Sequence, residues 1–199
     1  MAHLVRRAAT DRAEGGQGIV EFALIVPVFI TLLLGMLEFG FVFDENLTLE
    51  YASREGARVG SALVDGGGSP GCTTVDNQII AAVERVLTSD GSRITLERVG
   101  QIRIYLATAT GSEAGPVDVW IYAAGQGPVV DGKTLDFKLQ STSWSACSRT
   151  NAGSPAPSIG VSVSYSYQFQ TPIGIAVGFV GGSLPMADHT IMAMNPTAN

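Results

Sequence analysis

A long apolar stretch close to the N-terminus constrains this chain more than any other feature. The sixteen residues from Phe22 to Leu37 carry no charge, and after Glu38 the apolar character continues to Phe43. A helix over residues 22–43 is about 33 Å long, which is enough to cross a hydrocarbon core of about 30 Å. The stretch therefore predicts a transmembrane helix rather than the core helix of a soluble domain.

The charges on either side of the stretch predict its orientation. Three arginines lie within residues 1–16, whereas Asp44, Glu45 and Glu50 follow the stretch. The positive-inside rule then puts the N-terminus in the cytoplasm and the rest of the chain outside. A secretory signal peptide is the alternative, but its apolar core is shorter and a small-residue cleavage site follows it. No such site follows Phe43, which favours a retained single-pass anchor.

Composition argues against several other classes of protein. Twelve Lys and Arg stand against 18 Asp and Glu, for a net charge of -6 without a basic run, so we expect no nucleic-acid partner. Two cysteines alone cannot make a four-ligand zinc site, and the only histidines are His3 and His189, so we expect no metal and no cofactor. An exported hydrolase is a weak alternative, because its candidate carboxylates sit in no motif. These are Asp118, Asp131, Asp136 and Asp188.

Two carboxylates interrupt the apolar stretch, Glu21 at its start and Glu38 within it. A carboxylate in the hydrocarbon costs about 2.5–3.5 kcal/mol on insertion scales, so each requires a partner, a proton or a polar neighbourhood. Glu38 could be protonated, or it could reach the outer interface about four residues away. Pro27 and Gly35 also weaken the helix locally, which a membrane helix tolerates where neighbours satisfy the freed groups.

The residues around Glu21 resemble a prepilin processing site. They read Gly15-Gly16-Gln17-Gly18-Ile19-Val20-Glu21-Phe22. Together with the apolar run and the segment Ala52-Ser53-Arg54-Glu55-Gly56-Ala57-Arg58, they resemble the TadE-like family over about residues 16–62. Members of this family are minor pilins or pseudopilins of the tight-adherence (type IVc, Flp) pilus system. The resemblance therefore implies a structural role in a pilus and no catalysis by this chain.

The resemblance also implies roles for four residues. A prepilin peptidase would remove residues 1–16 by cutting after Gly16, which makes Gln17 the first residue of the mature chain and Glu21 the fifth. Glu21 and Phe22 would act in assembly, where the carboxylate neutralises the new α-amino group of a neighbouring subunit. Glu21 could otherwise be a carboxylate at the headgroup level without a partner. The implied partners are the bacterial inner membrane, the peptidase, other Tad pilins or pseudopilins and the pilus assembly platform.

Helical character is expected to continue beyond the apolar stretch, over residues 19–63. No proline occurs after Glu45 in this range, and Ala52, Gly56 and Gly60 form a stripe of small residues that allows another helix to approach closely. Two helices with a break near residues 44–46 are the alternative. We therefore expect residues 1–16 to form a leader and residues 17–63 a TadE-like N-terminal helix.

The remaining residues, 64–199, are expected to form an extracytoplasmic α+β head of the pilin type. A helix is predicted at residues 76–88, where apolar residues recur at helical spacing. Alternating apolar and polar residues predict strands at residues 102–106, 117–122, 161–170 and 189–194. One face of such an antiparallel sheet is packed and the other is wetted. We expect the predicted helix and the outer half of the long helix to cover the packed face.

The two cysteines and two segments of the head allow further predictions. Cys72 and Cys147 can form a disulfide outside the cytoplasm, although two free thiols or an intermolecular bridge are alternatives. Residues 123–158 are rich in Gly, Pro, Ser and Thr and predict an irregular surface excursion. The apolar residues 172–185 could pack under the sheet or form a subunit contact, and packing is favoured.

These observations together predict a minor pilin or pseudopilin that a prepilin peptidase processes and that takes part in assembly of an adhesive pilus. The alternative is an extracytoplasmic binding protein that stays anchored in the membrane and shares only the TadE-like N-terminus. The two differ in whether the protein leaves the membrane with sheared pili.

Overall fold

The computed structural model describes residues 11–63, 71–108, 110–150, 156–172, 174 and 182–194. The chain divides into two compact units, which we call the anchor unit and the head unit. The anchor unit comprises residues 1–41 and 169–182, and the head unit comprises residues 42–168 and 183–199.

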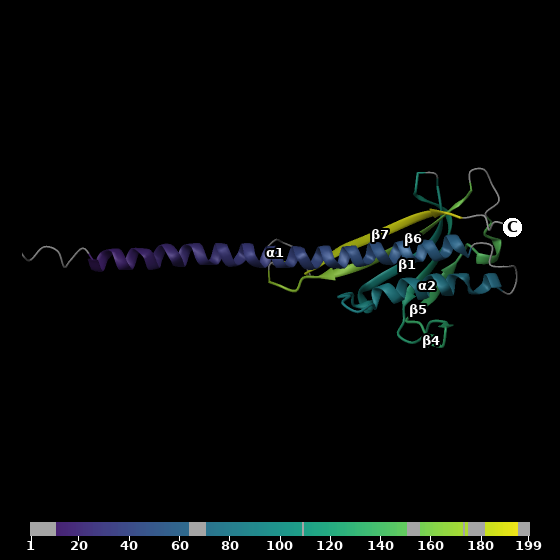
Figure 1. Cartoon of the computed structure of the whole chain (residues 1–199), viewed down its shortest axis with the longest axis horizontal. Coiled ribbons are helices and arrows are strands. Elements are labelled where there is room, and N and C mark those ends of the chain that lie inside the picture. The colour runs from purple at the N-terminus through teal and green to yellow at the C-terminus, as the bar shows by residue number, and fades with distance from the viewer. Residues whose placement is uncertain are drawn as a thin grey trace, which may run out of the picture. The chain divides into compact units, whose positions relative to one another are not determined.

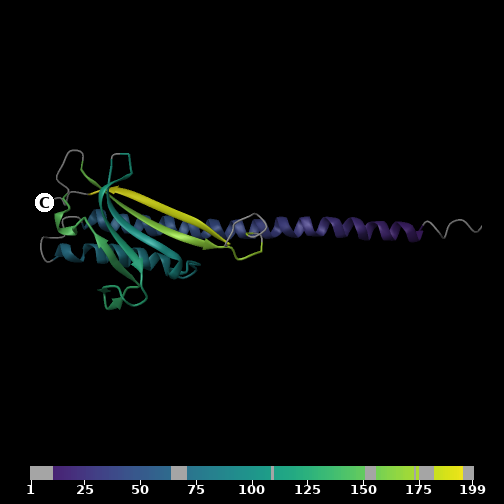
Figure 2. The ribbon, with the colours of Figure 1, turned by 180° about the vertical axis from the view of Figure 1, so that it is seen from behind.

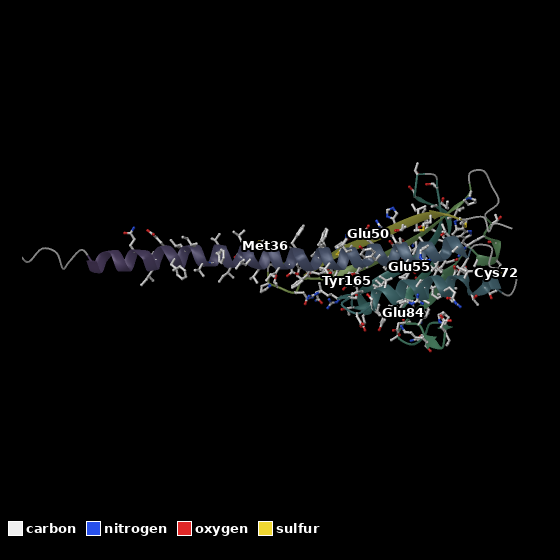
Figure 3. All side chains as sticks on the ribbon, viewed as in Figure 1. Met36, Glu50, Glu55, Cys72, Glu84 and Tyr165 are labelled. Atoms are coloured by element: carbon white, nitrogen blue, oxygen red, sulfur yellow. A yellow bond between two sulfur atoms is a disulfide. The ribbon has the colours of Figure 1, made fainter. Side chains whose placement is uncertain are left out.

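Helix α1, Asp11–Ala62, contributes to both units. Within the anchor unit its apolar side chains are exposed on all sides, and Figure 3 shows them projecting around the helix, with Met36 labelled. A helix that is apolar all round is suited to lipid, and this one is long and apolar enough to cross a membrane. Helical structure continues through residues 44–46, so the alternative of two helices with a break is wrong.

The head unit contains a five-stranded antiparallel sheet with strand order β5-β2-β1-β6-β7. A separate two-stranded ladder joins β3 and β4. The strands are β1 Val99–Ala107, β2 Glu113–Tyr122, β3 Val129–Val130, β4 Lys133–Thr134, β5 Phe137–Thr142, β6 Ser158–Gln168 and β7 Ser183–Ala193. The helices beside α1 are α2 Val75–Leu87 and three short 3-10 turns, η1 Gly71–Thr74, η2 Leu96–Arg98 and η3 Ala146–Ser148.

Helices cover one face of this sheet, as the alternating sequence predicts. Residues 42–62 of α1 and the whole of α2 lie against that face, with the helices nearer the viewer in Figure 1 and the sheet nearer in Figure 2. At the centre of the packed face, β1 and β6 contribute side chains that are at most 3% exposed, namely Ile102, Ile104, Val161, Val163, Tyr165 and Tyr167. The predicted α+β architecture, with an antiparallel sheet packed on helices, is confirmed.

The stripe of small residues on α1 makes this packing possible. A Cβ at Gly56 would lie 2.6 Å from Val83 Cγ2 of α2 and 3.1 Å from Val161 Cγ1 of β6. A Cβ at Gly60 would lie 2.7 Å from Ile159 Cδ1. Because real Cβ atoms do not approach neighbours this closely, the two glycines let α1 pack closely against both α2 and the sheet.

The structure corrects the prediction for residues 123–158. This range contains β3, β4, β5 and η3, and β5 is an edge strand of the main sheet rather than part of an irregular excursion. Strand β7 also begins at residue 183, earlier than the predicted residue 189. Most of the apolar range 172–185, whose packing under the sheet is predicted, lies outside the described residues, and residues 183–185 open β7.

Candidate functional site

The residues predicted to act in processing and assembly lie together in the first turns of α1. Gln17, Glu21 and Phe22 are all exposed, and Phe22 is 69% exposed. Gln17 Nε2 donates a hydrogen bond of 3.0 Å to Glu21 Oε1, one helical turn away. The Glu21 carboxylate therefore stands on the helix surface, where it accepts a hydrogen bond from an amide and leaves room for a second donor.

Gly16 has no atom within 4 Å of the position that a Cβ would occupy. The helix is also weak here, because Gly15, Gly16 and Gly18 each cost about 1 kcal/mol relative to alanine. A protease binds its substrate as an extended strand, so the helix would have to unwind here for the predicted cut after Gly16. Three glycines in four positions make that unwinding easier than anywhere else along α1.

Glu38, the second carboxylate of the apolar stretch, has partners that the sequence did not reveal. The backbone N–H of Gln170 donates to Glu38 Oε1 at 2.9 Å, and the backbone N–H of Thr171 donates to Glu38 Oε2 at 2.8 Å. Both donors belong to the anchor unit. The chain itself therefore supplies Glu38 with hydrogen-bond donors. Protonation of Glu38 and its reach to the outer interface stay predictions from the sequence.

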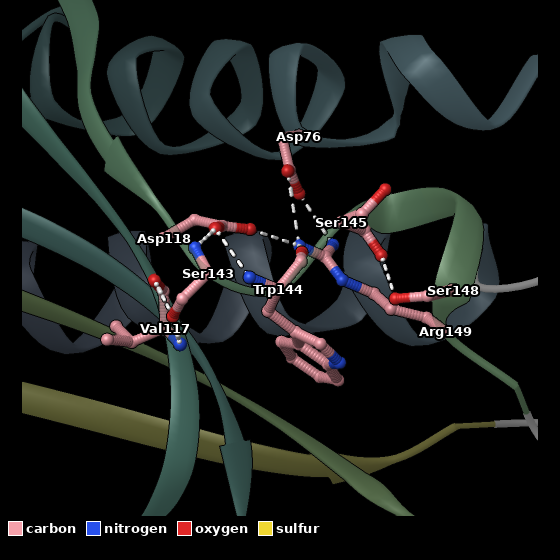
Figure 4. A network of polar contacts seen from close by, with 8 residues as sticks. All are labelled: Asp76, Val117, Asp118, Ser143, Trp144, Ser145, Ser148 and Arg149. Atoms are coloured by element: carbon pink, nitrogen blue, oxygen red, sulfur yellow. Dashed lines mark hydrogen bonds and ion pairs between the residues drawn. The ribbon is translucent and has the colours of Figure 1, made fainter.

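The predicted disulfide is present between Cys72 and Cys147, whose Cα atoms lie 4.9 Å apart. Next to it, Arg149 forms a buried ion network with two aspartates (Figure 4). Arg149 Nη1 donates to Asp76 Oδ1 at 2.5 Å, and Arg149 Nη2 donates to Asp118 Oδ2 at 2.8 Å. The guanidinium also lies over the ring of Trp144, 4.4 Å from its centroid.

Asp118 joins this network to the backbone of the following segment. Its Oδ1 accepts the N–H groups of Ser143 and Trp144 at 2.9 and 3.0 Å, so that both carboxylate oxygens are used. Burial raises the pKa of Asp76, and the charge and hydrogen bonds of Arg149 oppose that rise. Arg149 is the cation that the two carboxylates share, so the network depends on it.

The sequence carried one indirect signal for this network. Asp76 lies four residues after Cys72, and Arg149 lies two residues after Cys147. Because the disulfide joins Cys72 to Cys147, it also brings Arg149 close to Asp76. Nothing in the local pattern of Asp118 indicated that it would join them.

Another buried carboxylate, that of Glu84, holds the segment between β2 and β5. Glu84 of α2 has a fully buried side chain. Its Oε1 accepts a hydrogen bond from Lys133 Nζ at 2.8 Å, and its Oε2 accepts the backbone N–H of Asp136 at 2.8 Å. The β3–β4 hairpin is therefore fastened to α2.

The four aspartates considered for a hydrolase do not converge. Asp118 binds Arg149, Asp136 Oδ1 accepts the N–H of Gly125 at 2.7 Å, and Asp188 Oδ2 accepts the hydroxyl of Ser53 at 2.5 Å. Asp131 occupies a turn with a φ of 50°. Within the described residues, no three His, Cys, Asp or Glu side chains are grouped so as to hold a metal ion.

An exposed apolar helix that leads into an α+β head is consistent with a protein held in a membrane by a single helix. Residues 16–58 match the family described as TadE-like protein, and this part of the chain is TadE-like. The resemblance predicted from the sequence is thus confirmed for the N-terminal helix. No curated protein and no solved structure matches the chain significantly.

Proposed function

We propose that this chain is a minor pilin or pseudopilin of the tight-adherence (type IVc, Flp) pilus system. The observation that carries the proposal is the TadE-like match over residues 16–58, which suggests a Tad pilus-associated protein. The match falls on an exposed apolar helix with a carboxylate near its N-terminal end, the arrangement that a subunit assembled from the membrane requires. The head would give the subunit its particular contacts.

The first step of this function is proteolytic maturation. The precursor is inserted in the bacterial inner membrane with its N-terminus in the cytoplasm, and a prepilin peptidase cuts it after Gly16. The open surroundings of Gly16 and the weak helix around it favour access by the peptidase. The chain is the substrate of that reaction and catalyses none itself.

The second step is assembly through the new N-terminus. Cleavage creates an α-amino group at Gln17, whose reference pKa is near 8, so that it carries a positive charge. The carboxylate of Glu21 on a neighbouring subunit pairs with this amine, and two opposite charges that leave water together cost less than either does alone. The Gln17 side chain already donates to Glu21 within one chain, which supports an accessible acceptor at this level. The pairing would set the register between subunits, with Phe22 packing beside it.

Replacement of Gly16 by leucine tests the maturation step. Neither Gly16 nor Gly40 has an atom within 4 Å of the place that a Cβ would take, so leucine at either position fits the fold of an isolated chain. We expect Gly16→Leu to leave the full-length precursor and Gly40→Leu to be cut normally, as read by the intact mass of protein from the native host. A mature N-terminus at Gln17 in Gly16→Leu would refute the processing role.

Replacement of Glu21 by glutamine tests the assembly step. The amide keeps the shape of the side chain but cannot neutralise an amine. We expect Glu21→Gln to be cut after Gly16 and yet to be lost from sheared filaments, whereas the wild type is recovered in them. Wild-type protein that stays wholly in the membrane fraction after shearing would instead favour the permanently anchored binding protein.

A further inference from the structure

Glu38 is buried in a part of α1 where its neighbours are not. Its exposed fraction is 3%, whereas the exposed fractions of Met36, Leu37 and Phe39 are 74%, 55% and 73%. The helix itself therefore does not bury Glu38. The cover comes from residues 169–172, which follow β6 and belong to the same unit.

The contact with this segment is specific to a carboxylate. Two consecutive backbone N–H groups, those of Gln170 and Thr171, donate to different oxygens of Glu38 at 2.9 and 2.8 Å. The N–H of Phe169 donates to the carbonyl of Gly182 at 3.0 Å, so Phe169 is itself held in place next to this contact. Glu38 thus fastens the outgoing chain to α1 at one defined level of the helix.

That level cannot lie within the hydrocarbon. Non-helical backbone is not tolerated where it faces lipid, because its polar groups have no water to bind. Residues 169–172 are non-helical and carry Gln170, which is exposed. The sixteen residues before Glu38, in contrast, are uncharged.

We infer that Glu38 and the 169–172 turn mark the outer surface of the membrane, with the turn lying among the phospholipid headgroups. The hydrocarbon then ends at Leu37, about 9 Å before the end at Phe43 that the apolar pattern alone predicts. This inference rests on the proposed anchoring of α1 in a membrane and deepens it. It assigns to Glu38 a positioning role that fixes the level at which α1 leaves the bilayer.

If the outer end of the membrane span lies nearer the N-terminus, the inner end of the span shifts in the same direction. About twenty helical residues are needed to cross the hydrocarbon, so a span that ends at Leu37 begins near Gly18. Glu21 then lies about one helical turn, roughly 5 Å, inside the apolar layer rather than at its surface. A carboxylate at that depth requires a partner, which increases the advantage of pairing with the amine of a neighbouring subunit.

Cysteine accessibility along α1 tests the outer boundary directly. The two native cysteines form a disulfide, so in the absence of reductant only an introduced cysteine reacts with a membrane-impermeant maleimide. Single variants Leu32→Cys, Met36→Cys, Phe39→Cys and Phe43→Cys would be labelled in the full chain, held in nanodiscs of phosphatidylethanolamine and phosphatidylglycerol. All four positions are exposed in the protein, with exposed fractions from 57% to 74%, so that protection can come only from lipid.

We expect the cysteines at positions 32 and 36 to be protected and those at positions 39 and 43 to be labelled. Protection at position 39 would overturn the inference, because the boundary would then lie beyond Glu38. Protection at none of the four positions would refute the membrane anchor itself, and so the proposed function as well. An uncut Gly16→Leu precursor depends on neither boundary, so the two proposals can fail separately.

Replacement of Glu38 tests whether this residue sets the boundary. Glu38→Leu makes the apolar run continuous to Phe43 and removes both acceptors, so we expect the cysteine at position 39 to lose its labelling in that background. Glu50→Leu, which removes a carboxylate twelve residues further on, should leave the labelling unchanged. Unchanged labelling at position 39 in Glu38→Leu would show that Glu38 does not fix the boundary. Hydrogen exchange at Gln170 and Thr171 gives a second measurement, since Glu38→Gln should lose protection there without loss of the fold.

Discussion

Replacement of Arg149 by methionine should be one of the most damaging single changes in the head. The guanidinium side chain is fully buried, as is the side chain of its partner Asp118, while that of Asp76 is 17% exposed. Methionine fills a similar volume but leaves two neighbouring carboxylates without a cation. Breaking a buried ion pair from one side costs about 3–5 kcal/mol, because the charge left behind remains desolvated.

The loss should depend on pH, in a direction that the network fixes. Burial already raises the folded pKa of Asp76, and Arg149 is the main group that holds it down. Without Arg149 that pKa rises further, so Asp76 takes up a proton at a higher pH and relieves the repulsion. We therefore expect the destabilisation of Arg149→Met to be largest at pH 7 and to shrink as the pH falls through the raised pKa of Asp76.

Urea unfolding of the full chain in a non-ionic detergent measures this effect. Trp120 and Trp144 are 3% and 7% exposed, so their fluorescence reports the unfolding of the head. Arg54→Met is a matched control, because the pair of Arg54 with Glu50 is exposed and should be worth less than about 1 kcal/mol. A loss in Arg149→Met no larger than that in Arg54→Met would refute the reasoning.

A double variant separates the loss of charge from the loss of packing. Asparagine at position 118 keeps an oxygen that can accept the N–H groups of Ser143 and Trp144, yet it removes the charge that Arg149 neutralises. Arg149→Met combined with Asp118→Asn should therefore be more stable at pH 7 than Arg149→Met alone. A double variant as unstable as the single one would assign the loss to packing against Trp144.

Three further predictions use the same unfolding assay. Cys147→Ser opens a bridge between residues 75 apart, and the loop-entropy relation gives a loss of about 4 kcal/mol, so a loss below about 1 kcal/mol would contradict it. Gly56→Ala should cost about 1–3 kcal/mol because its Cβ meets Val83 at 2.6 Å, whereas Gly40→Ala, with no atom within 4 Å, should leave the unfolding of the head unchanged. Asp76 has a raised pKa, so its contribution to stability is full below about pH 3.8 and is lost as the pH rises through the folded pKa. The free energy of unfolding of the wild type minus that of Asp76→Asn should fall over this range, and a difference that rises with pH would contradict the assignment.

The parts of the fold that the sequence predicted have strong periodicity. The side chains of Val161, Val163, Tyr165 and Tyr167 alternate with serines, and all four are at most 3% exposed in β6. The small-residue stripe around Gly56 predicted a close helix contact, and α2 makes that contact. In both cases one face of the strand or helix packs against the core along its length, so the apolar or small residues recur at regular spacing in the sequence.

In the main sheet, the strand that the sequence missed, β5, and the strand that it shortened most, β7, are edge strands, where that condition fails. In β5 only Phe137 is buried, so the strand shows almost no alternation. In β7, Pro185 argues against a strand, although an edge strand tolerates proline because one side of its backbone has no ladder partner. Both β5 and β7 are formed by hydrogen bonds to a neighbouring strand, β2 or β6. The local pattern of apolar and polar residues does not indicate such pairing.

The residues of the candidate site likewise fall into those that the sequence places together and those that only the fold brings together. Gly16, Gln17 and Glu21 are close in sequence, so their proximity on one helix follows from the sequence alone. The partners of Glu38 lie 132 and 133 residues further on and bind through backbone N–H groups, which no residue type announces. Asp118 and Arg149 are likewise 31 residues apart and meet only because the sheet and the disulfide bring them together.

The burial of Leu49, Ala52 and Ala57 has a practical consequence for anyone who wishes to crystallise the head. All three side chains are 0% exposed, and α1 supplies them from residues that contacts assign to the head unit. A soluble fragment that began at residue 64 would lack these buried side chains of α1. The apolar side chains of α2 and β6 that pack against α1 would then be exposed to water. The fragment to express starts at Val42, where the head unit begins, because it keeps these buried residues of α1 and omits the exposed apolar residues of the anchor unit.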